Sequence, residues 1–282
     1  MPISESPRFL ETADRTVKPR RGGITHVIDT GTPTAAIEAR LEAYGEFVDV
    51  WKFGFGTAYV DAATAAKIEL LHAHDIKVCP GGTLLEAAWW QGRSERFFGW
   101  ARDVGFDCVE VSRGATGMPS SAKLALITAA RDHTFEVFAE VGSKDPGEPA
   151  RPEHWLTEAR RDIDSGACWL VAEGRESGTV GLYTADGLVR ADLVDALEGL
   201  GPEAPVVFEA PRPEQQAWLV NRLGTNVNLA NIPGDEILAV EALRRGLRSD
   251  TLRMRLPTAA GGQGPSRPVE EAQPRLGASP RP

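Results

Sequence analysis

The chain has 282 residues, of which 42% are hydrophobic and 25% are charged, and this composition excludes a fibrous or wholly disordered protein. Its net charge of −9 and isoelectric point of about 5.2 argue against nucleic acid or an anionic membrane as a partner, because both would be repelled. No run approaches the roughly 18 apolar residues that span a bilayer, and no secretion signal is recognisable, so we expect a cytoplasmic protein.

Apolar runs and amphipathic segments alternate through the middle of the chain. Residues 1–17 are polar and predict a flexible N-terminal segment, and residues 257–282, rich in Gly, Pro and Ala, predict a disordered tail. Residues 18–256 form the predicted domain. Its predicted strands are 25–29, 48–53, 77–79, 108–112, 136–141, 169–173, 206–209 and 227–230. The predicted helices between them are 34–44, 61–74, 84–104, 119–132, 152–165, 190–199, 213–223 and 235–246.

Repeated units of a strand followed by a helix indicate a parallel α/β fold. Two observations favour a closed (β/α)8 TIM barrel in a single domain over a doubly wound open sheet. No G-x-G-x-x-G motif follows the first predicted strand, and polar residues follow nearly every strand rather than only those at one switch point.

Charged and amide side chains stand at the carboxyl ends of the predicted strands, which converge on one rim in a barrel. The acids are Asp29, Glu110, Glu140, Glu173 and Glu209, and the other polar residues are Lys52, Arg175, Arg212, Asn228 and Asn231. Gathered carboxylates repel one another unless a cation neutralises them, and oxygen ligands without a Cys or His cluster favour Mg²⁺ over zinc. Alternatively, individual acids form structural ion pairs with Lys52, Arg175 or Arg212.

Phosphate in such barrels often lies near the last strands and a helix N-terminus. This position indicates residues 231–235 and the loop of Arg175 as candidate substrate contacts, and Asn228 and Asn231 are included with them.

Motifs at the strand ends follow one another over residues 18–253. They read KPRRGGITHVIDTG, VDVWKFGFGT, CPGGTLLE, GFDCVEVS, AEVGSK, VAEGRESG, FEAPRPEQQ, NVNLANI and LRRGLRSDTLR. In this order they resemble the phosphosulfolactate synthase family, to which plant heat-stress-associated proteins are also similar. The resemblance implies a (β/α)8 barrel, Mg²⁺ dependence, and addition of sulfite to phosphoenolpyruvate to give 2-phospho-3-sulfolactate, an early step towards coenzyme M in methanogens.

Two positions depart from the family pattern. An I-S-D-G motif after the fourth strand is Val111-Ser112-Arg113-Gly114 here, so a base replaces an acid. A paired-lysine motif, E-V-G-K-K, is Glu140-Val141-Gly142-Ser143-Lys144 and keeps one lysine. These departures leave open a different nucleophile or product.

The implied reaction suggests roles for the rim residues. Glu110, Glu140 and Glu173 are the expected metal ligands, with Asp29 and Glu209 as alternatives, because a metal on the substrate carboxylate would stabilise developing negative charge. Lys144 is the expected general acid, and Lys52 and Glu140 complete the predicted catalytic set.

Cationic side chains are assigned to the substrate anions. Lys18, Arg20, Lys52, Arg175 and Arg212 would hold the phosphate and the sulfur oxyanion, since a guanidinium suits bidentate contact with such groups. For Lys18 and Arg20 the alternative is a solvated charge run near the N-terminus.

Three functions therefore remain open: a synthase acting on phosphoenolpyruvate and sulfite, a related enzyme using another nucleophile, and a non-catalytic stress-associated homologue. Retention of Lys144 together with the rim acids argues against the third, and Arg113 keeps the second open. The sequence allows a homo-oligomer without indicating one.

Overall fold

The computed structural model describes residues 9–142, 150–201 and 204–256. Eight parallel strands form one sheet in the order β3-β2-β1-β8-β7-β6-β5-β4. They are β1 (Thr25–Asp29), β2 (Val50–Phe53), β3 (Lys77–Pro80), β4 (Cys108–Val111), β5 (Glu136–Val141), β6 (Trp169–Ala172), β7 (Val206–Glu209) and β8 (Leu229–Pro233). The remaining seam, between β3 and β4, is bridged where the Asp107 amide donates to the Val78 carbonyl at 3.2 Å. The ring confirms the predicted barrel.

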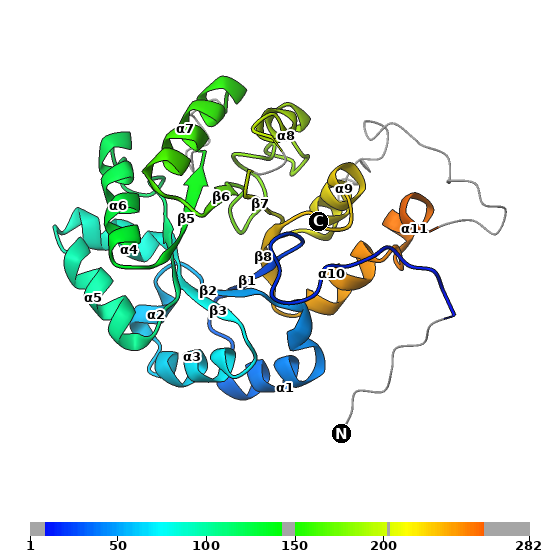
Figure 1. Cartoon of the computed structure of the whole chain (residues 1–282), viewed down its shortest axis with the longest axis horizontal. Helices are drawn as coiled ribbons and strands as arrows, with labels where there is room; N and C mark the ends of the chain where they lie inside the picture. The colour runs from blue at the N-terminus through cyan, green and yellow to red at the C-terminus, as the bar shows by residue number, and fades with distance from the viewer. Residues whose placement is uncertain (1–8, 143–149, 202–203, 257–282) are drawn as a thin grey trace, which may run out of the picture.

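Helices surround this ring on the outside (Figure 1). They are α1 (Thr34–Tyr44), α2 (Thr57–Val60), α3 (Thr64–His72), α4 (Gly82–Trp90), α5 (Ser94–Val104), α6 (Ser120–Asp132), α7 (Pro152–Ser165), α8 (Ala191–Glu198), α9 (Pro213–Leu223), α10 (Ile237–Arg244) and α11 (Ser249–Arg255), with a short 3-10 turn at η1 (Gly45–Phe47). No helix among the described residues is long and apolar enough to cross a membrane.

Several predicted boundaries were wrong for identifiable reasons. The predicted helix 61–74 begins later, as α3 at Thr64, and a separate short helix, α2, ends at Val60 before Asp61, whose carboxylate accepts the Ala63 amide at 2.8 Å. The predicted helix 84–104 is divided into α4 and α5 at a turn in which Gly92 has φ +66°. Side-chain hydrogen bonding to backbone and a left-handed glycine both interrupt helices that the hydrophobic period alone would continue.

The last strand begins later than predicted and is irregular. It spans Leu229–Pro233 rather than 227–230, and its pairing with β1 shifts register, so that Thr25 faces Leu229 and Val27 faces Ile232. The extra residue on β8 is a β-bulge, and Asn231 within it has φ +55°. A bulge redirects side chains, which decides where Asn231 points.

Apolar side chains fill the inside of the barrel and the space between strands and helices. The interior cluster consists of Ile24, Val50, Cys79, Cys108, Phe138, Val171, Val207 and Ala230. Two larger clusters hold the surrounding helices against the sheet. The barrel is therefore a packed core below its rim.

His26 is an exception inside this apolar core. Its side chain is fully buried beside the Phe138 ring, 5.2 Å between centroids, and neither ring nitrogen has a hydrogen-bond partner among the described residues. Burial, reinforced by the nearby Lys52 ammonium, holds the pKa of His26 well below its usual value. His26 is therefore neutral in the folded protein.

We expect His26 to make stability sensitive to acid. Below a pH of about 6.5, the ordinary pKa of histidine, the His26 imidazole is protonated in the unfolded chain but stays neutral in the folded chain. The free energy of unfolding therefore falls as the pH drops. His26→Leu should remove a slope of about 1.4 kcal/mol per pH unit from the unfolding free energy below pH 6.5. Urea denaturation of both proteins between pH 5 and 8 measures this difference, and parallel curves would contradict it.

Candidate active site

A pocket of about 330 Å³ opens at the carboxyl ends of the strands. Every strand, or the loop that follows it, contributes to its lining, because parallel strands bring all their carboxyl ends to one rim. The lining residues are Ile28, Lys52, Phe55, Gly82, Thr83, Glu110, Ala115, Glu140, Glu173, Arg175, Glu176, Glu209 and Asn231.

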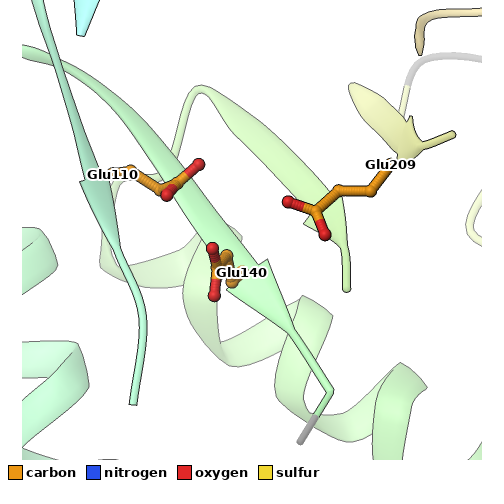
Figure 2. A group of neighbouring side chains, drawn as sticks. All are labelled: Glu110, Glu140 and Glu209. Carbon is orange, nitrogen blue, oxygen red and sulfur yellow. The ribbon is translucent and has the colours of Figure 1, made fainter. Parts of the chain in front are cut away.

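Three glutamates form a compact carboxylate triad in this pocket. Glu110, Glu140 and Glu209 are all buried, and one carboxylate oxygen from each lies within 4.8 Å of the others. They come from β4, β5 and β7 and converge on a common space (Figure 2). No other group of this kind occurs among the described residues.

Lys52 reaches the triad from β2. Its ammonium lies 2.7 Å from the Glu110 carboxylate and 3.4 Å from that of Glu209. Burial opposes the charged form of Lys52, but the carboxylates of Glu110, Glu209 and Glu140 outweigh burial and raise its pKa. The lysine therefore remains a cation and neutralises part of the triad.

Buried carboxylates dominate the described part of the rim. Glu173 also lines the pocket at 1% exposure, so four buried glutamates lie around the ammonium of Lys52 there. Burying carboxylates is costly unless cations and hydrogen bonds compensate for their charge. An all-oxygen donor set of this kind suits a hard divalent cation such as Mg²⁺.

Left-handed backbone conformations gather at this pocket. Phe55, Arg175 and Asn231 have φ between +55° and +58°, and all three line it. Non-glycine residues in this region are uncommon and cost roughly 1 kcal/mol or more each. The local strain turns their side chains towards the pocket and marks this rim as the functional end of the barrel.

The Glu173 side chain is hydrogen-bonded to the loop that follows β6. One carboxylate oxygen accepts the Arg175 amide at 2.7 Å, which helps to hold the strained residue in place. Glu173 lies outside the triad, whereas Glu209, expected only as an alternative ligand, lies within it.

Two predicted rim residues are not in the lining of the described pocket. The Asp29 carboxylate accepts the amides of Gly31 and Thr32 at 3.0 and 2.6 Å, and it lies 3.9 Å from the Lys67 ammonium. It therefore fixes the loop after β1 instead of joining the acids. The Arg212 guanidinium packs against Gly187.

Lys18, Arg20 and Asn228 lie at the amino-terminal end of the barrel, so the structure does not bring these three predicted substrate contacts together with the rim acids. The Lys18 ammonium donates to the carbonyls of Gly45 and His74, in turns that precede β2 and β3. The Arg20 guanidinium pairs with Asp49, just before β2, at 3.0 Å.

Asn228 has a structural role at the same end. Its amide donates to the Val206 carbonyl at 2.9 Å, and its oxygen accepts the Ile24 amide at 3.1 Å. These bonds join the start of β7 to the segment before β1.

Arg113 also points away from the pocket. Its guanidinium pairs with Glu158 of α7 at 2.9 Å, and it is not among the residues that line the rim. The exchange of an acid for a base at this position therefore leaves the described pocket lining unchanged. Lys144 lies outside the described residues.

Sequence reasoning missed Phe55 as a pocket residue. It stands between two glycines in the segment KFGFGT and is 43% exposed at the pocket mouth. Glycines on both sides of an aromatic residue are typical of a turn rather than of a core segment. This pattern could have indicated Phe55 as a residue of the pocket.

Asn231 offers an unused hydrogen-bonding group to the pocket. The residue is 3% exposed, and its side-chain oxygen has no hydrogen-bond partner among the described residues. A buried polar atom without a partner costs about 1–3 kcal/mol, which a bound ligand would recover. Asn231 is therefore the strongest neutral candidate for contact with substrate.

We expect Asn231→Gly to raise KM by about 10-fold, because the substrate loses one hydrogen bond. The free energy of unfolding should change little, because glycine tolerates the positive φ at this position. Steady-state kinetics and thermal melting test both parts. The matched control is Asn228→Ala, which removes two structural hydrogen bonds and should lower stability without changing KM. Equal KM values for Asn231→Gly and the native enzyme would contradict the assignment.

The fold and the acidic rim define a class: a (β/α)8-barrel protein with a buried carboxylate triad that could hold a metal ion. The family model of (2R)-phospho-3-sulfolactate synthase matches residues 13–250. Phosphosulfolactate synthase of Methanothermobacter thermautotrophicus is 37% identical over 246 residues, covering 86% of this chain and 95% of that protein. The Bacillus subtilis phosphosulfolactate synthase is 37% identical over 245 residues, with 86% and 97% covered. The chain belongs to the phosphosulfolactate synthase family.

Solved structures share the fold at low sequence identity. The 3-hexulose-6-phosphate synthase of Salmonella typhimurium superposes with a TM-score of 0.54 at 13% identity, covering 80% of this chain and all of that one. The YdjI aldolase of Escherichia coli gives 0.51 at 15% identity, covering 80% and 86%. These likenesses support the barrel architecture alone.

Proposed function

We propose that this protein catalyses the Mg²⁺-dependent addition of sulfite to phosphoenolpyruvate, forming 2-phospho-3-sulfolactate. The observation that carries the proposal is the buried triad of Glu110, Glu140 and Glu209 at the rim of a barrel that belongs to this enzyme family. Membership of the family suggests the reaction. The triad supplies a candidate cation site, at which addition of a nucleophile to the electron-rich enol would be feasible.

Glu110, Glu140 and Glu209 would hold the cation. A bound Mg²⁺ would withdraw electrons from the substrate carboxylate, which the addition of a nucleophile to an electron-rich enol requires. The residues fit this role because their carboxylate oxygens converge within 4.8 Å and all three side chains are buried.

Lys52 would orient the acids and the substrate together. Its ammonium bridges Glu110 and Glu209, which holds two of the three proposed ligands in a fixed relation. Since it lines the pocket, the same cation can also face an anionic group of the substrate.

Arg175 and Asn231 would complete substrate binding from neighbouring loops. Arg175 lines the pocket on the strained turn after β6 and presents a guanidinium suited to phosphate or a sulfur oxyanion. Asn231, on the other side of β7, supplies the buried amide. Lys144, close after β5 in sequence, is the proposed donor of the proton that completes the product.

We expect EDTA to abolish the formation of product and added Mg²⁺ or Mn²⁺ to restore it, because the cation is needed for electron withdrawal. Activity is measured after dialysis against the chelator, with Ca²⁺ as a comparison ion that prefers longer and more numerous oxygen contacts. Undiminished turnover in metal-free buffer would remove the metal from the proposal.

A further inference from the structure

A buried cluster of charged side chains lies outside the barrel, behind the acidic rim. It consists of Lys123 on α6, Glu158 and Asp162 on α7, and Arg113 in the loop after β4, and is called the Lys123 cluster below. The Lys123 ammonium is fully buried and lies 2.6 Å from Asp162 and 2.9 Å from Glu158. The Arg113 guanidinium meets the same Glu158 oxygen at 2.9 Å.

The cluster is attached to both strands that carry neighbouring members of the triad. Lys123 donates to the backbone carbonyl of Glu140 itself, at the end of β5. Glu158 also accepts the amide of Gly142, two residues further on, at 3.4 Å. Through Arg113, the same carboxylate holds the loop that begins just beyond Glu110 on β4. One network therefore fixes two adjacent strand ends.

Stability alone does not explain why such a cluster is buried. Two cations and two carboxylates balance in charge, but replacing a buried ionic network by apolar side chains of similar size is often neutral or stabilising. Hydrogen bonds to charged groups, by contrast, fix direction and distance, and a triad whose oxygens must meet within a few ångströms needs that precision.

We propose that Lys123 is a positioning residue that sets the separation of Glu110 and Glu140 for cation binding, acting through Glu158 and Arg113. This inference rests on the proposed metal site. Its supporting geometry is the direct bond from Lys123 to the Glu140 backbone and the chain of contacts from Lys123 through Glu158 to Arg113. It also gives the arginine at position 113 a role: it anchors the loop after β4 to α7.

Isothermal titration of Mg²⁺ into the chelator-stripped full-length protein tests the inference without measuring catalysis. Lys123→Met and Arg113→Met should each weaken Mg²⁺ binding by about 10-fold or more, as is typical when a partner behind a ligand is lost. Arg113→Lys should bind nearly as well as the native chain, because an ammonium can still pair with Glu158. The control is Ile127→Val, a core change on the same helix α6, which should lower stability without altering Mg²⁺ affinity.

The outcomes separate the inference from the function on which it rests. Native protein that binds no Mg²⁺ would overturn the metal site and the positioning role with it. Native protein that binds Mg²⁺, with an unchanged dissociation constant in Arg113→Met, would overturn the positioning role alone. If Lys123→Met fails to fold, Arg113→Met decides the matter, since Arg113 is partly exposed and its loss leaves the Lys123–Asp162 pair intact.

Discussion

Glu140→Gln is expected to lower kcat/KM by about 10²–10³-fold and to weaken Mg²⁺ binding, because the substitution removes a charged ligand oxygen while preserving shape. In chelator, the variant should melt no lower than the native protein, since it places one fewer carboxylate beside the buried carboxylates of Glu110 and Glu209. Loss of function without loss of stability is the signature of a residue kept for binding.

Glu136→Gln is the matched control for this prediction. Glu136 lies on the same strand, four residues earlier, and pairs with Lys77 and the Trp169 indole at the other end of the barrel. The chemical change is identical, but we expect little effect on kcat/KM or Mg²⁺ affinity. A comparable loss in both variants would show that disturbance of β5, rather than loss of a ligand, explains the result for Glu140.

Lys144→Ala is expected to lower kcat by roughly 10²–10⁴-fold, the usual contribution of a general acid, and to leave Mg²⁺ affinity nearly unchanged. The assignment rests on the sequence, where Lys144 follows β5 closely and carries the lysine of the family motif. Lys144→Arg should recover little, because a guanidinium does not release a proton near neutral pH. Rate constants from steady-state kinetics and Mg²⁺ titration test both statements.

The rival role for Lys144 is a phosphate clamp. A clamp predicts a raised KM with little change in kcat, and partial recovery by arginine, which also binds phosphate. That pattern would remove Lys144 from proton transfer and direct the search to Lys52, whose ammonium already lies among the acids.

Much of the fold could be predicted because the barrel repeats one simple unit. Strand runs such as 136–141 and helices such as 152–165 coincide with β5 and α7, since apolar periodicity is strong there. The bulge in β8 could not be predicted. It depends on how β8 pairs with β1, over 200 residues away, and it includes Asn231, which lines the pocket, whereas Asn228 precedes β8 at the other end of the barrel.

The acidic rim could be predicted for a similar reason, because parallel strands carry the residues at their carboxyl ends to one place. Glu110, Glu140 and Glu209 are those residues. Lys18 and Arg20 precede β1, and residues before a strand belong to the opposite end, so the same rule could have placed them there. The Lys123 cluster joins α6, α7 and the loop after β4 through side chains alone, a tertiary arrangement that no local pattern encodes.

Phosphorus NMR of the purified protein with phosphoenolpyruvate, sulfite and Mg²⁺ tests the central proposal most directly. We expect the phosphoenolpyruvate resonance to be replaced by that of a new phosphate monoester, only when sulfite and Mg²⁺ are both present, and at a greatly reduced rate with Glu140→Gln. Release of inorganic phosphate instead, or an unchanged phosphoenolpyruvate signal in the presence of both, would contradict a carbon–sulfur synthase at this rim.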